Sequence, residues 1–185
     1  MIKIIQPTSK DTSHDINDYF SNFKGEIIRS TEITAQDYTN KRVAIIGTDQ
    51  ASISYLDSIC SVAQHVEIFQ NQPQYILPKT EKVLQRLINH PLFIKNRKLF
   101  TQRIKSLVAL RFLETEVKNL WLKRQLMPNT ASIPPKFLKS DHYYTALQRE
   151  NCQLITWPIK KILSNSILSI DGIIHPVDVI ITTKL

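Results

Sequence analysis

The stretch Lys41-Arg-Val-Ala-Ile-Ile-Gly47-Thr48-Asp49-Gln50 decides the fold of this chain. Its apolar part does not alternate with polar residues and ends at a glycine, which is typical of a strand buried on both faces of a parallel sheet. A helix is predicted over 51–64, because apolar residues recur there at helical spacing. The run 65–69 predicts the next strand. Strand, turn, helix and strand together indicate a βαβ unit with parallel strands and a right-handed crossover.

The rest of the chain predicts a larger α/β domain around this unit. The other expected elements are helices over 83–88, 104–121 and 141–147, with Asp141 as the cap of the last, and strands over 152–156, 167–170, 173–175 and 177–182. The predicted fold is a Rossmann-like, largely parallel sheet with a helical insertion over about 80–126 and a small antiparallel β element over about 152–176. The predicted organisation is an extended lead-in over 1–22 and a single domain over 23–185.

Composition excludes several classes of protein. The chain has 185 residues, of which 42% are hydrophobic and 22% are charged, so it can bury a core and is not typical of a disordered chain. Its apolar runs fall short of the roughly 20 residues that a transmembrane helix needs, and the N-terminus shows no signal-peptide pattern. Two cysteines far apart in sequence define neither a zinc site nor a disulfide framework. We therefore expect a cytoplasmic protein.

The net charge of +8 is concentrated in one region, because residues 79–124 hold twelve basic and three acidic residues. One interpretation is a solvated helical face whose apolar side packs on the sheet. The other is contact with an acidic partner or a peripheral membrane contact through the basic helices 80–126. No recognition motif for nucleic acid accompanies these charges, so we expect no nucleic-acid partner.

The turn after the predicted strand 41–47 partly fits a dinucleotide-binding motif. Such a motif needs three small residues: one for the tight turn, one where the pyrophosphate approaches the backbone, and one where the helix packs on the strand. Gly47 occupies the first position, Asp49 the second and Ser52 the third. Many strand–turn–helix units carry one glycine and bind nothing, so this pattern alone does not establish a nucleotide site.

Further segments, in their order along residues 20–183, resemble one family. They are Phe23-Lys-Gly25-Glu-Ile-Ile-Arg29-Ser-Thr-Glu-Ile33, the stretch Lys41–Thr48, Phe69-Gln-Asn71-Gln-Pro-Gln-Tyr-Ile-Leu-Pro78, Ser140-Asp-His-Tyr-Tyr-Thr-Ala-Leu147, and Asp171-Gly172 followed by Asp178-Val-Ile-Ile-Thr-Thr183. Together they resemble the NADP-binding domain of the flavin-containing and Baeyer–Villiger monooxygenases, which in that family is inserted into the FAD domain. The motifs are degenerate, because Arg29 replaces a histidine, Ile33 a tryptophan and Asn71 an arginine.

The resemblance implies a cofactor site, in which Asp49 and Asn71 would weaken the binding of NADP(H). Gly47, Thr48, Asp49, Gln50 and Ser52 would line the pyrophosphate of NADP(H), and Asn71 would contact the adenosine ribose. The Asp49 carboxylate would repel the diphosphate, and Asn71 lacks the guanidinium that pairs with a 2′-phosphate. NADP(H) binding is therefore expected to be weakened. Alternatively, Asp49 is a helix N-cap in a domain that binds no nucleotide.

The resemblance also implies what the chain would need in order to act. The FAD-binding motif of the family has no counterpart here, so FAD is not expected in this chain alone, and we predict no catalytic or metal-ligating residues. By resemblance the chain is an oxidoreductase fragment or subunit that needs a flavin-bearing partner for NADPH-dependent oxygenation. The alternative is a pseudoenzyme, a Rossmann-like remnant that acts as a protein-interaction domain. We expect residues 177–183 at an exposed sheet edge, which would favour self-association or a partner chain.

Overall fold

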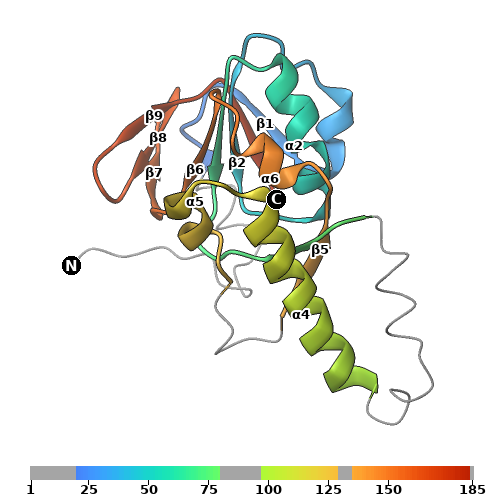
Figure 1. Ribbon diagram of the computed structural model, residues 1–185. Coiled ribbons are helices and arrows are strands. Elements are labelled where there is room, and N and C mark those ends of the chain that lie inside the picture. Colours follow the sequence, from blue (N-terminus) through green and yellow to red (C-terminus); the bar gives the residue numbers. More distant parts are fainter. Residues whose placement is uncertain (1–19, 80–96, 129–134, 184–185) are drawn as a thin grey trace.

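A five-stranded parallel sheet forms the centre of the protein (Figure 1). The computed structural model describes residues 20–79, 97–128 and 135–183. The strand order of the sheet is β1 (Glu26–Arg29), β10 (Val179–Thr182), β2 (Arg42–Ile46), β3 (His65–Phe69) and β6 (Cys152–Ile155). This arrangement confirms the predicted α/β fold with a Rossmann-like parallel sheet.

The predicted βαβ unit is present at the middle of this sheet. Helix α2 (Gln50–Val62) connects β2 to β3, and the two strands pair in parallel with Val43 opposite Val66 and Ile45 opposite Ile68. All four side chains are buried. Both faces of β2 are covered, as its unbroken apolar run predicts.

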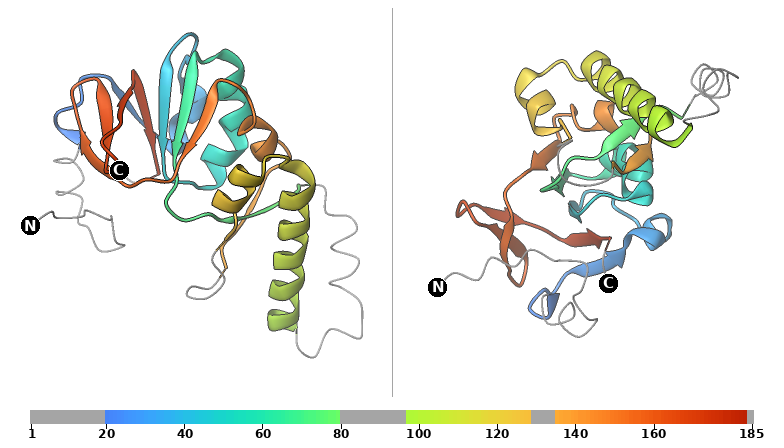
Figure 2. Two further views of the ribbon diagram at one scale, coloured as in Figure 1. Left: turned by 60° about the vertical axis from the view of Figure 1, so that its left-hand side comes forward. Right: turned by 90° about the horizontal axis from the view of Figure 1, so that it is seen from below.

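Helices cover one face of the sheet and a small β-sheet covers the other (Figure 2). Val43 and Ile45 of β2 pack in the helical layer formed by η1 (Ser30–Ala35), α2 and α6 (Tyr143–Ala146). Ala44 and Ile46 point to the opposite face, as the two-residue period of a strand requires. That face is covered by the antiparallel strands β7 (Ile159–Ile162), β8 (Ser166–Ser169) and β9 (Ile174–Pro176).

The antiparallel element is shorter than predicted, because the prediction of 152–176 included β6. Strand β6 pairs in parallel with β3, with Val66 opposite Cys152 and Phe69 opposite Ile155. The antiparallel pairs lie only within β7, β8 and β9. A strand of four residues carries no sequence signal for the direction of its neighbour, so the pattern could not assign β6 to a sheet.

The position expected for the last strand is wrong. Strand β10 does not lie at a sheet edge but between β1 and β2, with hydrogen-bonded parallel neighbours on both sides. The residues Val179, Ile180 and Ile181 are buried. Their burial removes the exposed edge as a reason for self-association, which itself stays a prediction.

The helical region after β4 (Tyr75–Leu77) differs from the single helix predicted over 104–121. Helix α4 (Arg97–Glu116) and helix α5 (Leu120–Gln125) are separate, because Asn119 Oδ1 accepts hydrogen bonds from the backbone N–H groups of Trp121 and Leu122 and so caps a new helix. Helix α4 packs against β4, which pairs in parallel with β5 (Phe137–Lys139), and it projects beyond the central sheet in Figure 1. The helix predicted over 83–88 lies outside the described residues.

The cap predicted for the helix over 141–147 is also wrong. Ser140 Oγ accepts hydrogen bonds from the backbone N–H groups of His142 and Tyr143, at 3.3 and 3.1 Å, and so satisfies the start of α6. Asp141 Oδ1 instead accepts from the backbone N–H of Lys79 at 2.8 Å. Both residues are good capping types, and only the fold decides which of them faces the helix.

Gly25 provides a test of packing between β1 and β10. A Cβ at this position would lie 2.3 Å from the backbone oxygen of Asp178 and 2.6 Å from Cζ of the Phe23 ring. We predict that Gly25→Ala lowers the free energy of unfolding by about 3 kcal/mol in urea titrations, because a backbone oxygen cannot move aside. Gly172→Ala is the control, since its Cβ would meet no atom within 4 Å and only its φ of +88° opposes it. A Gly25→Ala loss no larger than that of the control would contradict this packing.

Candidate functional site

The predicted site residues lie at the carboxyl edge of the parallel sheet, where open α/β folds bind their ligands. Gly47 and Thr48 follow β2, and α2 begins at Gln50 with Asp49 as its N-cap. Ser52 lies in the first turn of α2, whereas Asn71 follows the neighbouring strand β3. The structure thus brings five of the six predicted residues to one helix N-terminus and places Asn71 at the end of the next strand.

Gly47 is a glycine for a physical reason. Its φ is +85°, a region that residues with a side chain rarely adopt. A Cβ there would also lie 2.6 Å from Oγ1 of Thr183, the residue that follows β10. The backbone N–H of Gly47 donates to the carbonyl of Phe69 at 3.0 Å. The first small position of the motif therefore has the tight turn that the sequence predicts.

Asp49 occupies the N-terminus of α2 with its own carboxylate. Its Oδ1 accepts a hydrogen bond from the Ser52 backbone N–H at 2.8 Å, and the Asp49 backbone N–H donates to Ser52 Oγ at 2.9 Å, which completes a capping box. Its Oδ2 accepts from the Ser30 hydroxyl at 2.5 Å. The Ser52 N–H, which would otherwise be open to a bound anion, is thus already bonded to a carboxylate of the chain.

The surroundings of Asp49 favour its charged form. Burial acts to raise the pKa of this carboxyl, but the hydrogen bonds from Ser30 and Ser52 and the nearby charge of Lys136 oppose it, and the net pKa lies below the ordinary value of an aspartate. The partial positive charge at a helix N-terminus acts in the same direction. Asp49 is therefore an anion at neutral pH.

Gln50 is held away from the turn by β5. Its Oε1 accepts a hydrogen bond from the Lys139 backbone N–H at 3.0 Å, while its Nε2 donates to the Lys139 carbonyl at 2.8 Å and to Ser54 Oγ at 2.9 Å. These bonds use both ends of the side-chain amide. In this conformation Gln50 joins α2 to β5 and does not offer an amide to a phosphate.

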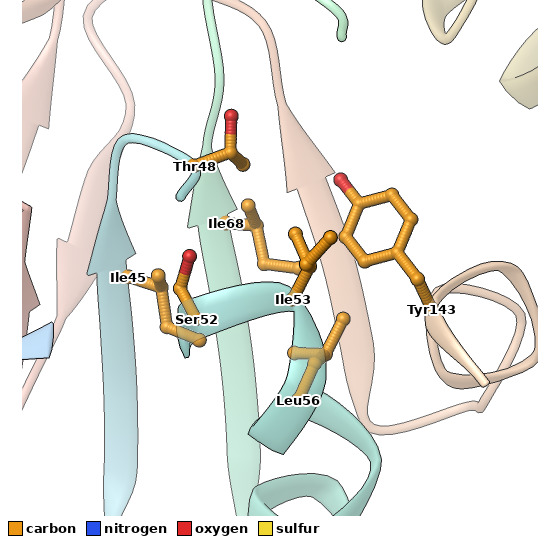
Figure 3. A pocket seen from close by; sticks show the side chains of 7 residues that line it. All are labelled: Ile45, Thr48, Ser52, Ile53, Leu56, Ile68 and Tyr143. Carbon is orange, nitrogen blue, oxygen red and sulfur yellow. The ribbon is translucent and has the colours of Figure 1, made fainter. Parts of the chain in front are cut away.

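The space beside the turn is small (Figure 3). It has a volume of about 150 Å³ including open solvent, and its walls are Ile45, Thr48, Ser52, Ile53, Leu56, Ile68 and Tyr143. Tyr143 reaches in from α6, and its hydroxyl donates to Gln70 Oε1 at 2.7 Å. At the helix N-terminus itself, the Asp49 carboxylate is an anion that does not fit beside the diphosphate of a dinucleotide.

Of the three positions at which the motifs are degenerate, Asn71 and Arg29 lie on the surface, whereas Ile33 is buried. Asn71 is exposed after β3, and Arg29 is exposed at the end of β1. An amide at position 71 can hydrogen-bond a ribose hydroxyl, but it cannot form the bidentate ion pair that a guanidinium forms with a phosphate. The site therefore lacks the charge at this position that would select a 2′-phosphate.

Sequence reasoning missed three contributors to the site. Ser30 bonds Asp49, Lys136 places a positive charge near it, and Tyr143 closes the neighbouring space through Gln70. Each comes from an element distant in the sequence from the turn at Gly47. No local pattern marks such residues, because only the folded sheet brings them to the same edge.

The basic helices expose apolar side chains among their charges. Leu107, Leu120 and Trp121 are 66%, 72% and 68% exposed, so they do not form the buried stripe predicted for a single helix. Arg111 pairs with Glu114 at 3.4 Å on the exposed side of α4. No helix among the described residues has the length and apolar character needed to cross a membrane. Contact with an acidic partner or a membrane surface stays a prediction.

Known proteins are similar to this chain in sequence and in fold. A Baeyer–Villiger monooxygenase of Pseudomonas aeruginosa is 28% identical to it over 89% of this chain and 36% of its own length, and one of Streptomyces coelicolor is 22% identical over 86% and 35%. Among solved structures, an open cyclohexanone monooxygenase matches 88% of this chain with a TM-score of 0.68 at 16% identity. A steroid monooxygenase bound to NADP matches 90% with a TM-score of 0.66 at 19% identity. No family model matches.

These similarities show the fold of the chain and the proteins to which it is related. Its fold is the Rossmann-like domain fold found within flavin-dependent monooxygenases. The predicted resemblance is confirmed: the chain is homologous to a segment of the Baeyer–Villiger monooxygenases. It spans about a third of the length of the curated relatives that it matches.

The capping role of Asp49 predicts a defined pH dependence of stability. Asp49→Ala should lower the free energy of unfolding at pH 7 by about 0.5–2 kcal/mol, the usual cost of losing an N-cap. Because the folded-state pKa is lowered, the contribution of Asp49 is present above its unfolded pKa of about 3.9 and is lost as the pH falls through the lower folded value. Urea titrations at successive pH values measure the difference between the two proteins.

Asp49→Asn is the matched control for this experiment. An asparagine oxygen can also cap a helix, so this variant should lose less stability than Asp49→Ala. Its side chain does not titrate, so its stability relative to Asp49→Ala should stay constant with pH. A wild-type advantage over Asp49→Ala that persists unchanged to pH 2 would contradict the capping role of the charged carboxylate.

Proposed function

We propose that this chain is a pyridine-nucleotide-type domain of a flavin-dependent monooxygenase in which Asp49 has taken the place of the nucleotide phosphate. The domain then serves as a scaffold and interaction domain and does not bind NADP(H) tightly. We further propose that residues 23–185 form this one domain. The homology to Baeyer–Villiger monooxygenases supports the class of the domain, and the geometry at α2 supports the loss of nucleotide binding.

The observation that carries the proposal is the bonding of the Asp49 carboxylate at the start of α2. A pyrophosphate needs backbone N–H groups at a helix N-terminus, and the Ser52 N–H already donates to Asp49 Oδ1 at 2.8 Å. A diphosphate that approached this turn would meet a second anion. Two negative unit charges about 4 Å apart repel each other by about 4 kcal/mol at an effective dielectric constant near 20.

The second candidate function is NADP(H) binding in a domain that works with a flavin-bearing polypeptide. It is favoured by the glycine turn at Gly47, with φ of +85°, and by a fold neighbour, the steroid monooxygenase, which is bound to NADP. In that case Thr48 and Ser52 would face the pyrophosphate, Asn71 would face the ribose, and Asp49 would have to leave the Ser52 N–H. The flavin would supply the oxygen chemistry, and this chain would bind and orient the nucleotide.

A calorimetric titration with NADPH, and with NADH as a second ligand, separates the two functions. The wild-type chain should show no saturable binding up to millimolar nucleotide. Asp49→Gly should bind NADPH about a hundredfold more tightly than the wild type, because it removes the opposing charge, frees the Ser52 N–H and keeps a residue that is acceptable at an N-cap.

Asp37→Gly is the matched control, because it makes the same substitution at an exposed residue that precedes β2, away from its carboxyl end. It removes the same charge from the chain and should leave nucleotide binding unchanged. Circular dichroism of each variant confirms that it is folded. Micromolar binding of NADPH by the wild type would overturn the scaffold proposal and establish the second candidate.

A further inference from the structure

A buried network of polar side chains joins the central sheet to the antiparallel sheet. Glu67 Oε1 of β3 lies 2.9 Å from His175 Nδ1 of β9, and Ser169 Oγ of β8 lies 3.0 Å from His175 Nε2. All three residues are buried. The Phe69 ring, which belongs to the apolar cluster between the two sheets, meets the His175 ring edge-on at 5.2 Å. Polar bonds thus cross an otherwise apolar interface between the two layers.

The Ser169 hydroxyl has one hydrogen and two acceptors beside the imidazole. Its Oγ donates to Asp171 Oδ1, in the turn between β8 and β9, and lies 3.1 Å from the Ile173 carbonyl oxygen. Above all, the hydrogen bond from Ser169 lowers the pKa of the Asp171 carboxyl, so this group is an anion at neutral pH. A carbonyl and an ionised carboxylate donate no hydrogen bond. Because they use the hydroxyl hydrogen, His175 Nε2 must donate to the Ser169 oxygen.

The other ring nitrogen also faces an acceptor. The hydrogen between Glu67 and His175 belongs to the imidazole, because imidazole is a stronger base than a carboxylate. His175 Nδ1 therefore donates to Glu67. A histidine that donates from both ring nitrogens is an imidazolium. A charge in an apolar layer needs a partner, and the Glu67 carboxylate provides the opposite charge at hydrogen-bond distance.

We propose that His175 is an imidazolium held between Glu67 and Ser169, and that loss of its proton loosens the antiparallel sheet against the central sheet. A neutral ring has one hydrogen for two acceptors, so one of its two bonds must break. The bond to Glu67 is the one that crosses between the sheets. This pH-sensitive contact acts whether or not the domain binds a nucleotide.

Groups that exchange protons with solvent flank the buried ring on both sides. On β3, the His65 side chain is 37% exposed, and its Nε2 lies 3.8 Å from the same Glu67 oxygen that bonds His175. In the turn between β8 and β9, Asp171 is exposed and reaches the ring through Ser169. These are the titratable groups that face His175 from the elements around it, and they connect it to the pH of the solvent.

The order of carboxylate, imidazole and hydroxyl is also that of a hydrolytic triad, but this arrangement does not suit catalysis. Ser169 is fully buried, so a substrate cannot reach it. Its hydroxyl donates to Asp171, so the imidazole is not placed to take its proton. In the part of the chain that the structure describes, no cluster of histidine, cysteine and acidic residues is suited to a metal ion either. The bonds support a titrating contact between layers.

The test follows the ring nitrogens of His175 by NMR in the full ¹⁵N-labelled wild-type chain between pH 5.5 and 9. His175→Gln identifies their resonances. Both nitrogens should carry a hydrogen at pH 5.5, and one should lose it as the pH rises. The backbone amide resonances of β7–β9 should move with the same midpoint, whereas those of β1 should stay. A ring whose protonation does not change over this range, or changes without any movement in β7–β9, would overturn the proposal.

Urea titrations measure the effect of the same proton on stability. The charged ring stabilises the folded state below about pH 6.5, where an unfolded histidine is also protonated, and this contribution is lost as the pH rises and the folded protein releases the proton. The ratio of the unfolding constants of His175→Gln and the wild type should therefore fall about tenfold between pH 5.5 and 9. His65→Gln is the matched control and should show no such fall. A constant ratio for His175→Gln would contradict the proposal.

Asp171→Asn tests the reason for the second ring hydrogen. Asp171 is exposed, and asparagine before Gly172 favours a two-residue hairpin turn, so the variant should fold. Without the anion, the Ser169 hydroxyl can donate to His175 Nε2. The ring should then lose its second hydrogen about one pH unit lower than in the wild type. Asp37→Asn, at an exposed aspartate outside the network, should not move this midpoint. An unmoved midpoint in Asp171→Asn would overturn the assignment of the hydrogens.

Discussion

The carboxylate of Asp49 at the N-terminus of α2 is the interaction on which the candidate site depends. It accepts hydrogen bonds from the Ser52 N–H and from the Ser30 hydroxyl, and so links η1, which follows β1, to the helix of the βαβ unit. A helix N-terminus is a general site for anions, and here the anion belongs to the chain. In the proposed function, the same bonds that stabilise the fold compete directly with a nucleotide phosphate.

The proposed competition would explain how a nucleotide-domain fold can persist while its binding site changes. The sheet needs Gly47 for its turn, because of the positive φ and the close approach of Thr183. It needs a small residue at Ser52, which is buried where α2 meets the sheet. Neither requirement depends on a bound cofactor. The position that a pyrophosphate would need open is filled by Asp49, a residue that itself supports the helix.

The local parts of the fold could be predicted from the sequence, and the non-local parts could not. The βαβ unit is readable because strand, turn and helix signals follow one another within 41–69. The insertion of β10 between β1 and β2 leaves no such signal, since the partners come from opposite ends of the chain. The break at Asn119 was hidden because Leu120 and Trp121 continue the apolar spacing of α4 while facing solvent.

Some residues of the candidate site could likewise be predicted from the sequence, and others could not. Gly47, Asp49 and Ser52 were found by their spacing, and the N-cap role of Asp49 was one of the two interpretations that the sequence allowed. The contact of the Ser30 hydroxyl with Asp49 and the bonds that hold Gln50 to β5 depend on the folded sheet. Residues distant in sequence meet there without any pattern that connects them.

The measurement that tests the central claim most directly is the amide resonance of Ser52 in a ¹⁵N-labelled wild-type chain, followed by NMR during addition of NADPH. If the Asp49 carboxylate keeps the Ser52 N–H, the resonance stays at its original position up to millimolar NADPH while the spectrum remains that of a folded protein. A saturable shift of this resonance at micromolar NADPH would show that the phosphate displaces Asp49 and would contradict the account.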